Sequence, residues 1–327
     1  FSVTCVLTYL LACSNRLFSI LDYPNERSLH ATPIPRTGGL AICIGVLVGM
    51  IAVSFVLDVG PLFTWVAGAA LLVATVSFVD DLFSLSITFR LVAHTGAASL
   101  LMVGGLEPAG PWLPNVGIDL PRPLAWTVGV LFVVWMVNLY NFMDGSDGLA
   151  GGMTVIGFAT YGLAAWLGGN ADLALLAVSI AAAAAGFLIF NFPPAKIFMG
   201  DVGSIPLGFL AGALGIAGWL SDSWPLWFPL VVFAPFIVDA SITLARRLLR
   251  GERAWQAHRQ HYYQRLILSG WSHRRTAVGA YALMLLCSTV ALISWQGSRT
   301  IQVSAISALV LLIAVTLWSI DRRWART

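Results

Sequence analysis

The sequence predicts an all-α, polytopic membrane protein, on the strength of its composition and its long apolar runs. Hydrophobic residues make up 58% of the 327 residues, charged residues make up only 10%, and the mean hydropathy is +0.85. A soluble domain carries roughly 25% charged residues. Apolar runs of about 18–22 residues recur from end to end, each long enough to cross a hydrocarbon core of roughly 30 Å. These observations exclude the soluble, disordered, fibrous and disulfide-stapled classes.

The apolar runs are expected to be helices. Strands of a membrane barrel alternate apolar and polar residues over about 10 positions, whereas residues 173–190 are apolar on every face. Lipid offers the backbone no hydrogen-bond partner, so helices remain. We expect about 10–11 transmembrane helices, at residues 1–20, 38–57, 62–79, 89–105, 124–140, 150–168, 171–190, 204–220, 225–246, 276–296 and 300–320. Pro225, Pro229 and Pro235 are expected to bend the ninth of these.

Lysine and arginine side chains indicate the orientation of these helices. With the N-terminus outside, all of the 18 Lys and Arg residues except Arg122 and Arg299 fall in cytoplasmic segments or at cytoplasmic helix ends. Such an asymmetry is the basis of the positive-inside rule. We therefore expect an outer N-terminus and a cytoplasmic C-terminus. A basic inner face also suits phosphorylated substrates and anionic lipids, although topology alone would account for it. Because the chain starts at Phe1 and not at Met, a short segment is expected to precede it.

The polar residues are concentrated between the predicted helices. The Pro- and Gly-rich residues 106–123 are expected to form an outer loop or hairpin. The other polar residues gather in five predicted cytoplasmic segments, residues 22–39, 80–90, 138–152, 191–204 and 246–275. His94 and Asp239 are the main ionisable residues within helices, and each lies near a cytoplasmic end. Transporters usually place such groups near the bilayer midplane. The pattern therefore favours chemistry at the inner membrane surface.

Residues 138–152 read Asn-Leu-Tyr-Asn-Phe-Met-Asp-Gly-Ser-Asp-Gly-Leu-Ala-Gly-Gly. Asn138, Asn141 and Asp144 follow one another at a spacing of three residues, which places them on one face of a helix end. The two Asp-Gly pairs, including Asp147, predict a turn into the next helix. Amide and carboxylate oxygens this close together suit Mg²⁺, which takes one or two protein carboxylates plus substrate phosphate oxygens. This segment is therefore a candidate metal and phosphate site.

Residues 196–204 read Lys-Ile-Phe-Met-Gly-Asp-Val-Gly-Ser and precede the helix predicted to start near Ser204. Backbone N–H groups at a helix N-terminus, left open by Gly200 and Gly203, form an anion site. Asp201 would repel a phosphate unless a cation lies between them, so the pairing indicates a metal. The alternative is that Asp201 or Ser204 only caps the helix.

The remaining cytoplasmic segments are basic or acidic in a less specific way. Asp80 and Asp81 close the third predicted span, which on its own is a weak signal of function. Arg27, His30 and Arg36 lie in a basic loop that enters the second helix at Gly38. Guanidinium groups bind phosphates with two hydrogen bonds. Residues 246–275 supply eight more arginines and three histidines, with aromatic residues that could stack on a base or sugar, namely Trp255, Tyr262 and Tyr263.

Taken together, these segments resemble the polyprenyl-phosphate N-acetylhexosamine-1-phosphate transferases. The match runs in order through residues 27–39, Asp80-Asp81, residues 138–152, residues 191–204 and residues 239–266. Many members have a His-x-His-His motif before Arg-Leu in the last large loop. Here that run is His261-Tyr-Tyr-Gln-Arg-Leu, so only the first histidine is kept. This departure is similar to the subgroup that acts on unusual N-acetylated amino sugars in O-antigen assembly.

The resemblance implies transfer of a sugar 1-phosphate from a UDP-sugar to undecaprenyl phosphate, with release of UMP, at the start of O-antigen or another cell-envelope glycan. It implies one integral membrane catalytic domain over residues 1–327, in the bacterial inner membrane, with its active site on the cytoplasmic face. Mg²⁺ is the expected cofactor, with Mn²⁺ as an alternative. The expected partners are the two substrates and membrane lipid, with no nucleic acid, and a homodimer is left open.

The resemblance also implies roles for individual residues. The expected catalytic residues are Asp80, Asp81, Asp144, Asp147 and His261. The expected substrate-binding residues are Arg36, Asn138, Asn141, Lys196, Gly200, Ser204 and Arg265. The expected metal ligands are Asn141 and Asp201. Asp80 and Asp81 are assigned to the lipid phosphate, and direct in-line attack is favoured because a phosphomonoester is mostly dianionic at pH 7.

Two other functions fit parts of the pattern. A transporter or flippase for a phosphorylated or lipid-linked substrate predicts charges at the midplane and two pseudo-symmetric halves. A glycosyltransferase that uses polyprenyl-linked donors predicts Asp80 and Asp81 on the outer face. The charge asymmetry and the cytoplasmic gathering of polar residues favour the sugar-phosphate transferase over both.

Overall fold

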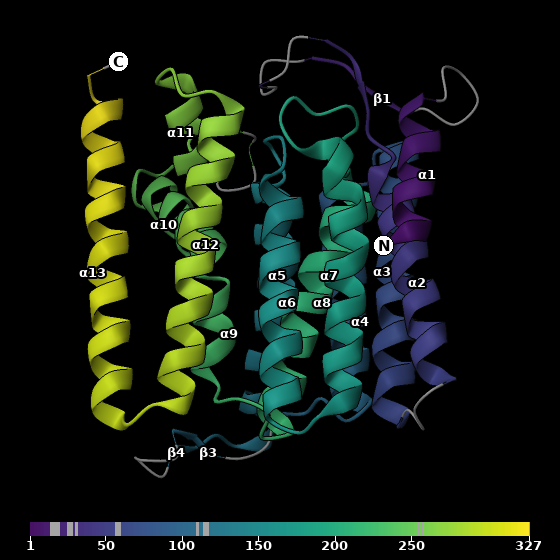
Figure 1. Cartoon of the computed structure of the whole chain (residues 1–327), viewed down its shortest axis with the longest axis vertical. Coiled ribbons are helices and arrows are strands. Elements are labelled where there is room, and N and C mark those ends of the chain that lie inside the picture. Colours follow the sequence, from purple (N-terminus) through teal and green to yellow (C-terminus); the bar gives the residue numbers. More distant parts are fainter. Residues whose placement is uncertain are drawn as a thin grey trace.

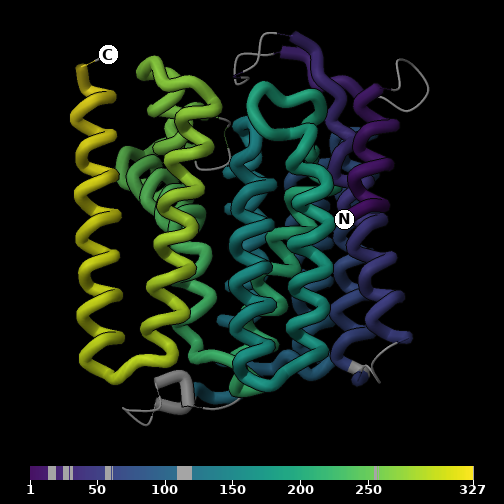
Figure 2. Tube along the Cα trace, viewed as in Figure 1, coloured from purple at the N-terminus to yellow at the C-terminus, as the bar shows by residue number. Residues whose placement is uncertain are grey.

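A computed structural model describes residues 1–13, 20–24, 29, 32–55, 60–108, 111–113, 118–253, 256 and 258–326 of the chain. Within these residues the protein is a bundle of helices that run up and down along a common direction (Figure 1 and Figure 2). At least one helix overlaps each of the spans predicted from the sequence. The prediction of an all-α, polytopic membrane protein is confirmed.

The helices follow one another with short connections. Their bounds are α1 Ser2–Cys13, α2 Gly38–Ser54, α3 Pro61–Phe83, α4 Ile87–Val103, α5 Arg122–Met143, α6 Leu149–Leu167, α7 Ala171–Asn191, α8 Asp201–Leu220, α9 Trp227–Val232, α10 Ala234–Leu249, α11 Tyr262–Leu268, α12 His273–Gln296 and α13 Arg299–Trp324. In the described part of the chain, seven of them are long and apolar enough to cross a membrane: α3, α5, α6, α7, α8, α12 and α13. Helices α1, α2 and α4 are apolar but shorter.

The ninth predicted span is divided in two. Helix α9 ends at Val232 and α10 begins at Ala234, with Phe233 between them in a non-helical conformation (φ −94°, ψ 12°). Pro235 lies in the first turn of α10. Because proline lacks an N–H group, it is favoured in the first turn of a helix and disrupts the hydrogen bonds of a helix interior. The bend expected from the prolines is therefore a break at Phe233.

Helix α8 lies in the middle of the bundle, and 94% of an apolar stretch of 18 residues in it is buried inside the protein. It packs against α3 and α5. Small residues allow this contact: a Cβ added at Gly208 would lie 2.5 Å from the carbonyl oxygen of Met136 and 2.8 Å from the Cβ of Tyr140. Close backbone approach through small residues is typical of helix packing in membranes. Helix α8 thereby brings its N-terminal turn next to the end of α5.

The polar segments lie at one end of the bundle, as the sequence predicted. The hairpin of β1 (Leu21–Asp22) and β2 (Ile34–Pro35), helix α11 and the C-terminus are at the upper end in Figure 1. The hairpin of β3 (Pro111–Leu113) and β4 (Ile118–Asp119) is at the opposite end, so the predicted outer segment is a hairpin. We call the end that carries α11 and the C-terminus the basic end.

Candidate active site

Asn141, in the last turn of α5, and Asp201, the first residue of α8, meet at the basic end. They are 60 residues apart in the sequence, and the Asn141 amide Nδ2 donates to the Asp201 carboxylate at 2.8 Å. The same Nδ2 lies 3.2 Å from the hydroxyl of the buried Ser204. The structure thus brings together the two residues that the sequence assigned to a metal.

Asp81 lies in the last turn of α3, beside the start of α8. Its carboxylate accepts a hydrogen bond of 2.9 Å from the backbone N–H of Val202. The Arg36 guanidinium lies 3.6 Å from the same carboxylate and donates to the Asp81 carbonyl at 2.7 Å. Two backbone bonds hold the Arg36 loop in this place, because Gly38 and Gly39 donate to the carbonyl groups of residues 198 and 199 at 2.9 and 2.8 Å. Asp81 and Arg36 therefore tie three chain segments together.

Gly200 is required where these segments meet. Its φ of +73° lies in the left-handed region that favours glycine. A Cβ there would also lie 2.5 Å from the Arg36 carbonyl oxygen and 3.2 Å from the Asp81 carboxylate. This turn therefore requires glycine at position 200, and the role of Gly200 in a phosphate site stays a prediction.

Asp80 is paired with Arg90, a residue that sequence reasoning did not assign to the site. The Arg90 guanidinium donates to the Asp80 carboxylate at 2.9 Å and lies 3.5 Å from the carboxylate of Asp201. The backbone N–H of Leu85 donates to the other oxygen of Asp80 at 2.7 Å. Arg90 follows Asp80 by one short turn and lies in the first turn of α4. Its position ten residues after Asp80, in the same polar segment of the sequence, was the signal that could have assigned Arg90 to the site.

Asp144 is half-buried just beyond the end of α5. Among the described residues no group donates a hydrogen bond to its carboxylate. Burial, together with the negative charges of Asp201 and Asp81, raises the pKa of Asp144 well above its ordinary value. A carboxylate without a donor, next to two others, is a position that a divalent cation would stabilise.

The donor set fits Mg²⁺ bound together with a substrate. In the described part of the chain, no group of three or more His, Cys, Asp or Glu side chains is arranged to hold a metal ion. Mg²⁺ is usually held by one or two protein carboxylates, with substrate phosphates and water as its other ligands. Asp201 and Asp144, with the Asn141 amide, match that smaller requirement.

His261 forms a second cluster that adjoins the first. It is the N-cap residue of α11, and the buried carboxylate of Asp239 holds it there. Asp239 lies 3.1 Å from the His261 ring Nδ1 and accepts from the backbone N–H groups of Tyr262 and Tyr263 at 2.9 and 3.2 Å. The His261 ring stacks on Phe142 with the centroids 6.0 Å apart. Because Phe142 follows Asn141, the histidine and the metal candidates lie on adjoining parts of one site.

His258 lies next to His261, with ring centroids 4.9 Å apart. Burial, and then the positive charges of His261 and Arg247, lower its pKa from 6.5 to about 4. His258 is therefore neutral at pH 7 and adds no charge to the cluster.

Tyr263, which stands where the motif has a histidine, and its neighbour Tyr262 make structural contacts. Tyr263 is buried, and its hydroxyl donates to the Phe142 carbonyl at 3.1 Å. Tyr262 is buried, and the guanidinium groups of Arg246 and Arg265 lie 5.5 and 4.8 Å from its ring centroid. Neither ring is exposed to solvent as a stacking surface for a base or sugar. The predicted stacking residue Trp255, together with Arg27 and His30, lies outside the described residues.

Asp147 and Asn191 hold two predicted segments to each other. The Asp147 carboxylate accepts from the backbone N–H of Ala195 at 3.0 Å and lies 3.6 Å from the His273 ring. Asn191 accepts from the Gly148 N–H and donates to the Ile197 carbonyl, both at 2.9 Å. Both side chains therefore fix the Asp-Gly turn against the loop before α8.

Three predicted substrate-binding residues lie apart from this cluster of contacts. The Asn138 amide donates to the Val134 carbonyl in its own helix at 2.7 Å, and Lys196 is exposed. The Arg265 guanidinium donates to Asp321 in α13 at 2.6 Å and to the Gln260 carbonyl at 2.7 Å. Arg265 is thus committed to a contact with the last helix.

Asp321 is a second residue that sequence reasoning missed. Besides Arg265, it accepts from Arg246 at 2.8 Å and from the Tyr262 hydroxyl at 3.3 Å. This single carboxylate joins α13 to α10 and α11, and so to the helix that His261 caps. Its position near the C-terminus, among arginines, gave no local signal of such a role.

Known proteins resemble this chain over most of its length. Residues 63–219 match the family described as glycosyl transferase family 4. A probable undecaprenyl-phosphate N-acetylglucosaminyl 1-phosphate transferase of Bacillus subtilis is 32% identical over 299 residues, which cover 90% of this chain and 82% of that protein. A decaprenyl-phosphate N-acetylglucosaminephosphotransferase of Mycobacterium tuberculosis is 30% identical over 313 residues, which cover 84% and 77%. An undecaprenyl-phosphate alpha-N-acetylglucosaminyl 1-phosphate transferase of Escherichia coli K12 is 27% identical over 277 residues, which cover 79% and 72%.

The fold and the gathered polar groups define a multi-pass membrane protein of the transferase type. The chain belongs to the family of polyprenyl-phosphate N-acetylglucosaminyl 1-phosphate transferases, within glycosyl transferase family 4. The matched residues 63–219 include Asp80, Asp81, Asn141, Asp144 and Asp201 but end before His261.

Proposed function

We propose that the protein transfers an N-acetylated amino sugar 1-phosphate from a UDP-sugar to undecaprenyl phosphate, at the cytoplasmic face of a bacterial inner membrane. The products are undecaprenyl-diphospho-sugar and UMP, and the reaction would begin an O-antigen or another cell-envelope glycan. The observation that carries the proposal is the contact between Asn141 and Asp201, which joins two predicted phosphate segments beside paired arginines and aspartates. Family membership favours this enzyme over the transporter alternative.

The reaction balances without a further reactant. An oxygen of the acceptor phosphate forms a bond to the β-phosphorus of the donor. The bond from that phosphorus to the bridging oxygen breaks, and the oxygen leaves with the electron pair as part of UMP. The acceptor is mostly dianionic at neutral pH, so its attack requires alignment and charge compensation more than a general base.

Asp201 and Asp144, with Asn141, would hold the Mg²⁺, for which Mn²⁺ is an alternative. The ion would offset the charge of the donor diphosphate. Asn141 orients Asp201 through its hydrogen bond of 2.8 Å. A bound cation would stabilise the charged form of Asp144, because burial and two like charges destabilise that form.

The arginines would orient the phosphates. Arg36 and Arg90 are each held by an aspartate, Asp81 and Asp80, that leaves further guanidinium N–H groups to donate. The two aspartates thus act on the lipid phosphate by positioning cations. An arginine between each aspartate and the phosphate attracts an anionic substrate, whereas a carboxylate in direct contact with the phosphate would repel it.

His261 would contact the donor. Its Nδ1 is bonded to Asp239, which leaves Nε2 as the ring atom for a phosphate or nucleotide oxygen. Arg265 takes no part, because its guanidinium pairs with Asp321. Asp147 would keep the Asp-Gly turn in place through the Ala195 N–H.

The test is an assay of the full chain in membranes with undecaprenyl phosphate, Mg²⁺ and a panel of UDP-N-acetyl sugars, read as release of UMP. Asp201→Ala is expected to abolish turnover and the response to Mg²⁺ while the protein stays folded. Asp172→Ala, an exposed residue at the opposite end of α7, is the matched control and should retain activity. Substantial turnover by Asp201→Ala, or UMP release with no UDP-sugar of the panel, would overturn the proposal.

A further inference from the structure

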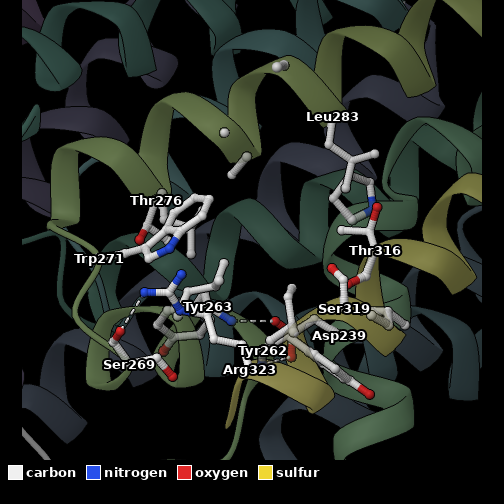
Figure 3. Close-up of a pocket in the computed structure, with 18 of the residues that line it drawn as sticks. Asp239, Tyr262, Tyr263, Ser269, Trp271, Thr276, Leu283, Thr316, Ser319 and Arg323 are labelled. Carbon is white, nitrogen blue, oxygen red and sulfur yellow. Dashed lines mark hydrogen bonds between the residues drawn. The ribbon is translucent and has the colours of Figure 1, made fainter. Parts of the chain in front are cut away.

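A large cavity lies between α10, α11, α12 and α13. Its volume is about 920 Å³, near the top of the roughly 300–1,000 Å³ range of small-molecule sites. Most of its wall is apolar, with Leu283 and Leu286 from α12 opposite Leu312 and Leu317 from α13. Figure 3 shows Leu283 close to Thr316, with Trp271 and Thr276 on the other side of the space. An apolar chain would fit between these two helices.

The rim of the cavity at the basic end is cationic. Arg322 and Arg323 from the last turn of α13, and Arg326 just after it, line the rim. Arg323 donates to the Ser269 carbonyl at 2.8 Å (Figure 3), and Arg322 lies 4.0 Å from the Trp318 ring centroid. No carboxylate pairs with any of the three in the part of the chain that the structure describes. By contrast, Asp321 already pairs with Arg246 and Arg265.

We propose that this cavity binds an anionic phospholipid, with an acyl chain between α12 and α13 and the phosphate among Arg322, Arg323 and Arg326. Basic pockets between transmembrane helices, at the level of the head groups, are typical sites for anionic lipids. The positive-inside rule explains why arginines gather at this end of the bundle. It does not explain why three of them, with no carboxylate partner among the described residues, line the rim of an apolar cavity.

The bound lipid touches the supports of the candidate active site. Asp239, Tyr262 and Tyr263 form part of the cavity wall, as do Met143 and Leu149 at the two ends of the Asp-Gly turn. These residues hold His261 and the Phe142 carbonyl in place. The proposed lipid thus braces residues that position the candidate site, and its role is structural.

The test is native mass spectrometry of the full chain in detergent, with phosphatidylglycerol and with phosphatidylcholine of the same acyl chains. We expect phosphatidylglycerol to be retained and phosphatidylcholine to dissociate. Arg322→Gln with Arg326→Gln should weaken phosphatidylglycerol binding by about fivefold for each arginine removed. Arg299→Gln, at the other end of α13 and also exposed, is the charge-matched control and should bind as the wild type does.

A second variant tests the cavity without changing charge. A Cβ added at Gly279 meets only the Trp271 ring, at 3.7 Å, so Gly279→Phe extends into the cavity. This variant should lose phosphatidylglycerol while keeping its unfolding midpoint.

Three results would overturn the proposal: equal retention of both phospholipids, unchanged binding in the Arg322 and Arg326 variant, and unchanged binding in Gly279→Phe. Undecaprenyl phosphate added as a competitor can give a fourth contradicting result. Its preferential retention would show that the cavity binds the acceptor substrate and not a phospholipid. All of these readouts are independent of transferase activity, so their failure is distinguishable from failure of the proposed function.

Discussion

Asp144 differs from the other aspartates around it in having no donor among the described residues. Asp80 has Arg90, Asp81 has the Val202 N–H, and Asp201 has Asn141. Asp144 is half-buried, and burial together with the charges of Asp201 and Asp81 disfavours its charged form. The charged form of Asp144 thus lowers the stability of the folded protein, and a cation bound beside it would offset this effect.

Replacing Asp144 separates these two effects. Asp144→Asn removes the like-charge repulsion, so in metal-free buffer we expect an unfolding midpoint raised by roughly 2 °C, for about 1 kcal/mol. Turnover should fall by about 10²-fold, because a charge that acts in the transition state is lost. Thermal unfolding with and without Mg²⁺ checks this: the wild type should gain more from Mg²⁺ than the variant does. Equal gains would contradict the assignment.

His258 predicts how stability depends on pH. Its pKa is about 4 in the folded protein and near 6.5 when unfolded. Between these values the unfolded chain binds a proton that the folded chain does not, so stability falls as the pH is lowered from 6.5 to 4. His258→Gln should therefore show a smaller drop in unfolding midpoint between pH 7 and pH 5 than the wild type shows. Identical slopes for the two proteins would remove His258 as the cause.

The contact of α5 with α8 sets the geometry of the carboxylates. A Cβ at Gly208 would press on Met136, Val137 and Tyr140, the last of which precedes Asn141. Gly208→Ala should therefore destabilise the protein by about 1–3 kcal/mol, as overpacked positions do, and lower turnover by shifting Asn141 away from Asp201. Gly68→Ala in α3, where a Cβ meets nothing within 4 Å, is the matched control. Unfolding midpoints and UMP release measure both effects, and equal behaviour of the two variants would refute this role.

Asp321 attaches helix α13 at the basic end, beside the bond from Arg323 to the Ser269 carbonyl. Asp321→Asn leaves Arg246 and Arg265 without a charged partner, and charge-assisted hydrogen bonds of this kind contribute about 1.5–3 kcal/mol. We expect a lower unfolding midpoint and reduced turnover, because α11 also carries His261. Asp321→Glu should recover part of both losses. Recovery of neither would show that the contact with Arg265 does not position α11.

At the scale of the whole molecule, the two ends of the bundle should face opposite sides of the membrane. Arg250 lies exposed at the basic end, and Ala171 lies exposed at the start of α7, at the other end. In a background without the four cysteines, we expect Arg250→Cys to react with an impermeant maleimide only in inside-out vesicles and Ala171→Cys only in intact spheroplasts. Labelling of both from one side would contradict the up-and-down topology.

The helices could be predicted well because, in lipid, the backbone N–H and C=O groups of each apolar run must form hydrogen bonds within that run. The sequence predicted the meeting of Asn141 with Asp201 because both segments had to emerge at the same membrane surface. It could not predict that Arg265 pairs with Asp321, since partner choice between distant helices depends on tertiary packing. Helix α11 was expected as loop for a related reason: its first turn is held by Asp239, a residue 22 positions earlier than His261.

The enclosure of α8 has a consequence for how this protein responds to its surroundings. A helix with other helices on all sides has no acyl chains as neighbours, so a change in bilayer thickness or fluidity strains α13 and α4 before it reaches Asp201. Random substitutions should show the same gradient. Substitutions along the middle of α8 will be tolerated worst. Substitutions on the outer surface of α13 will be tolerated best, because only 6% of an apolar stretch of 18 residues in that helix is buried.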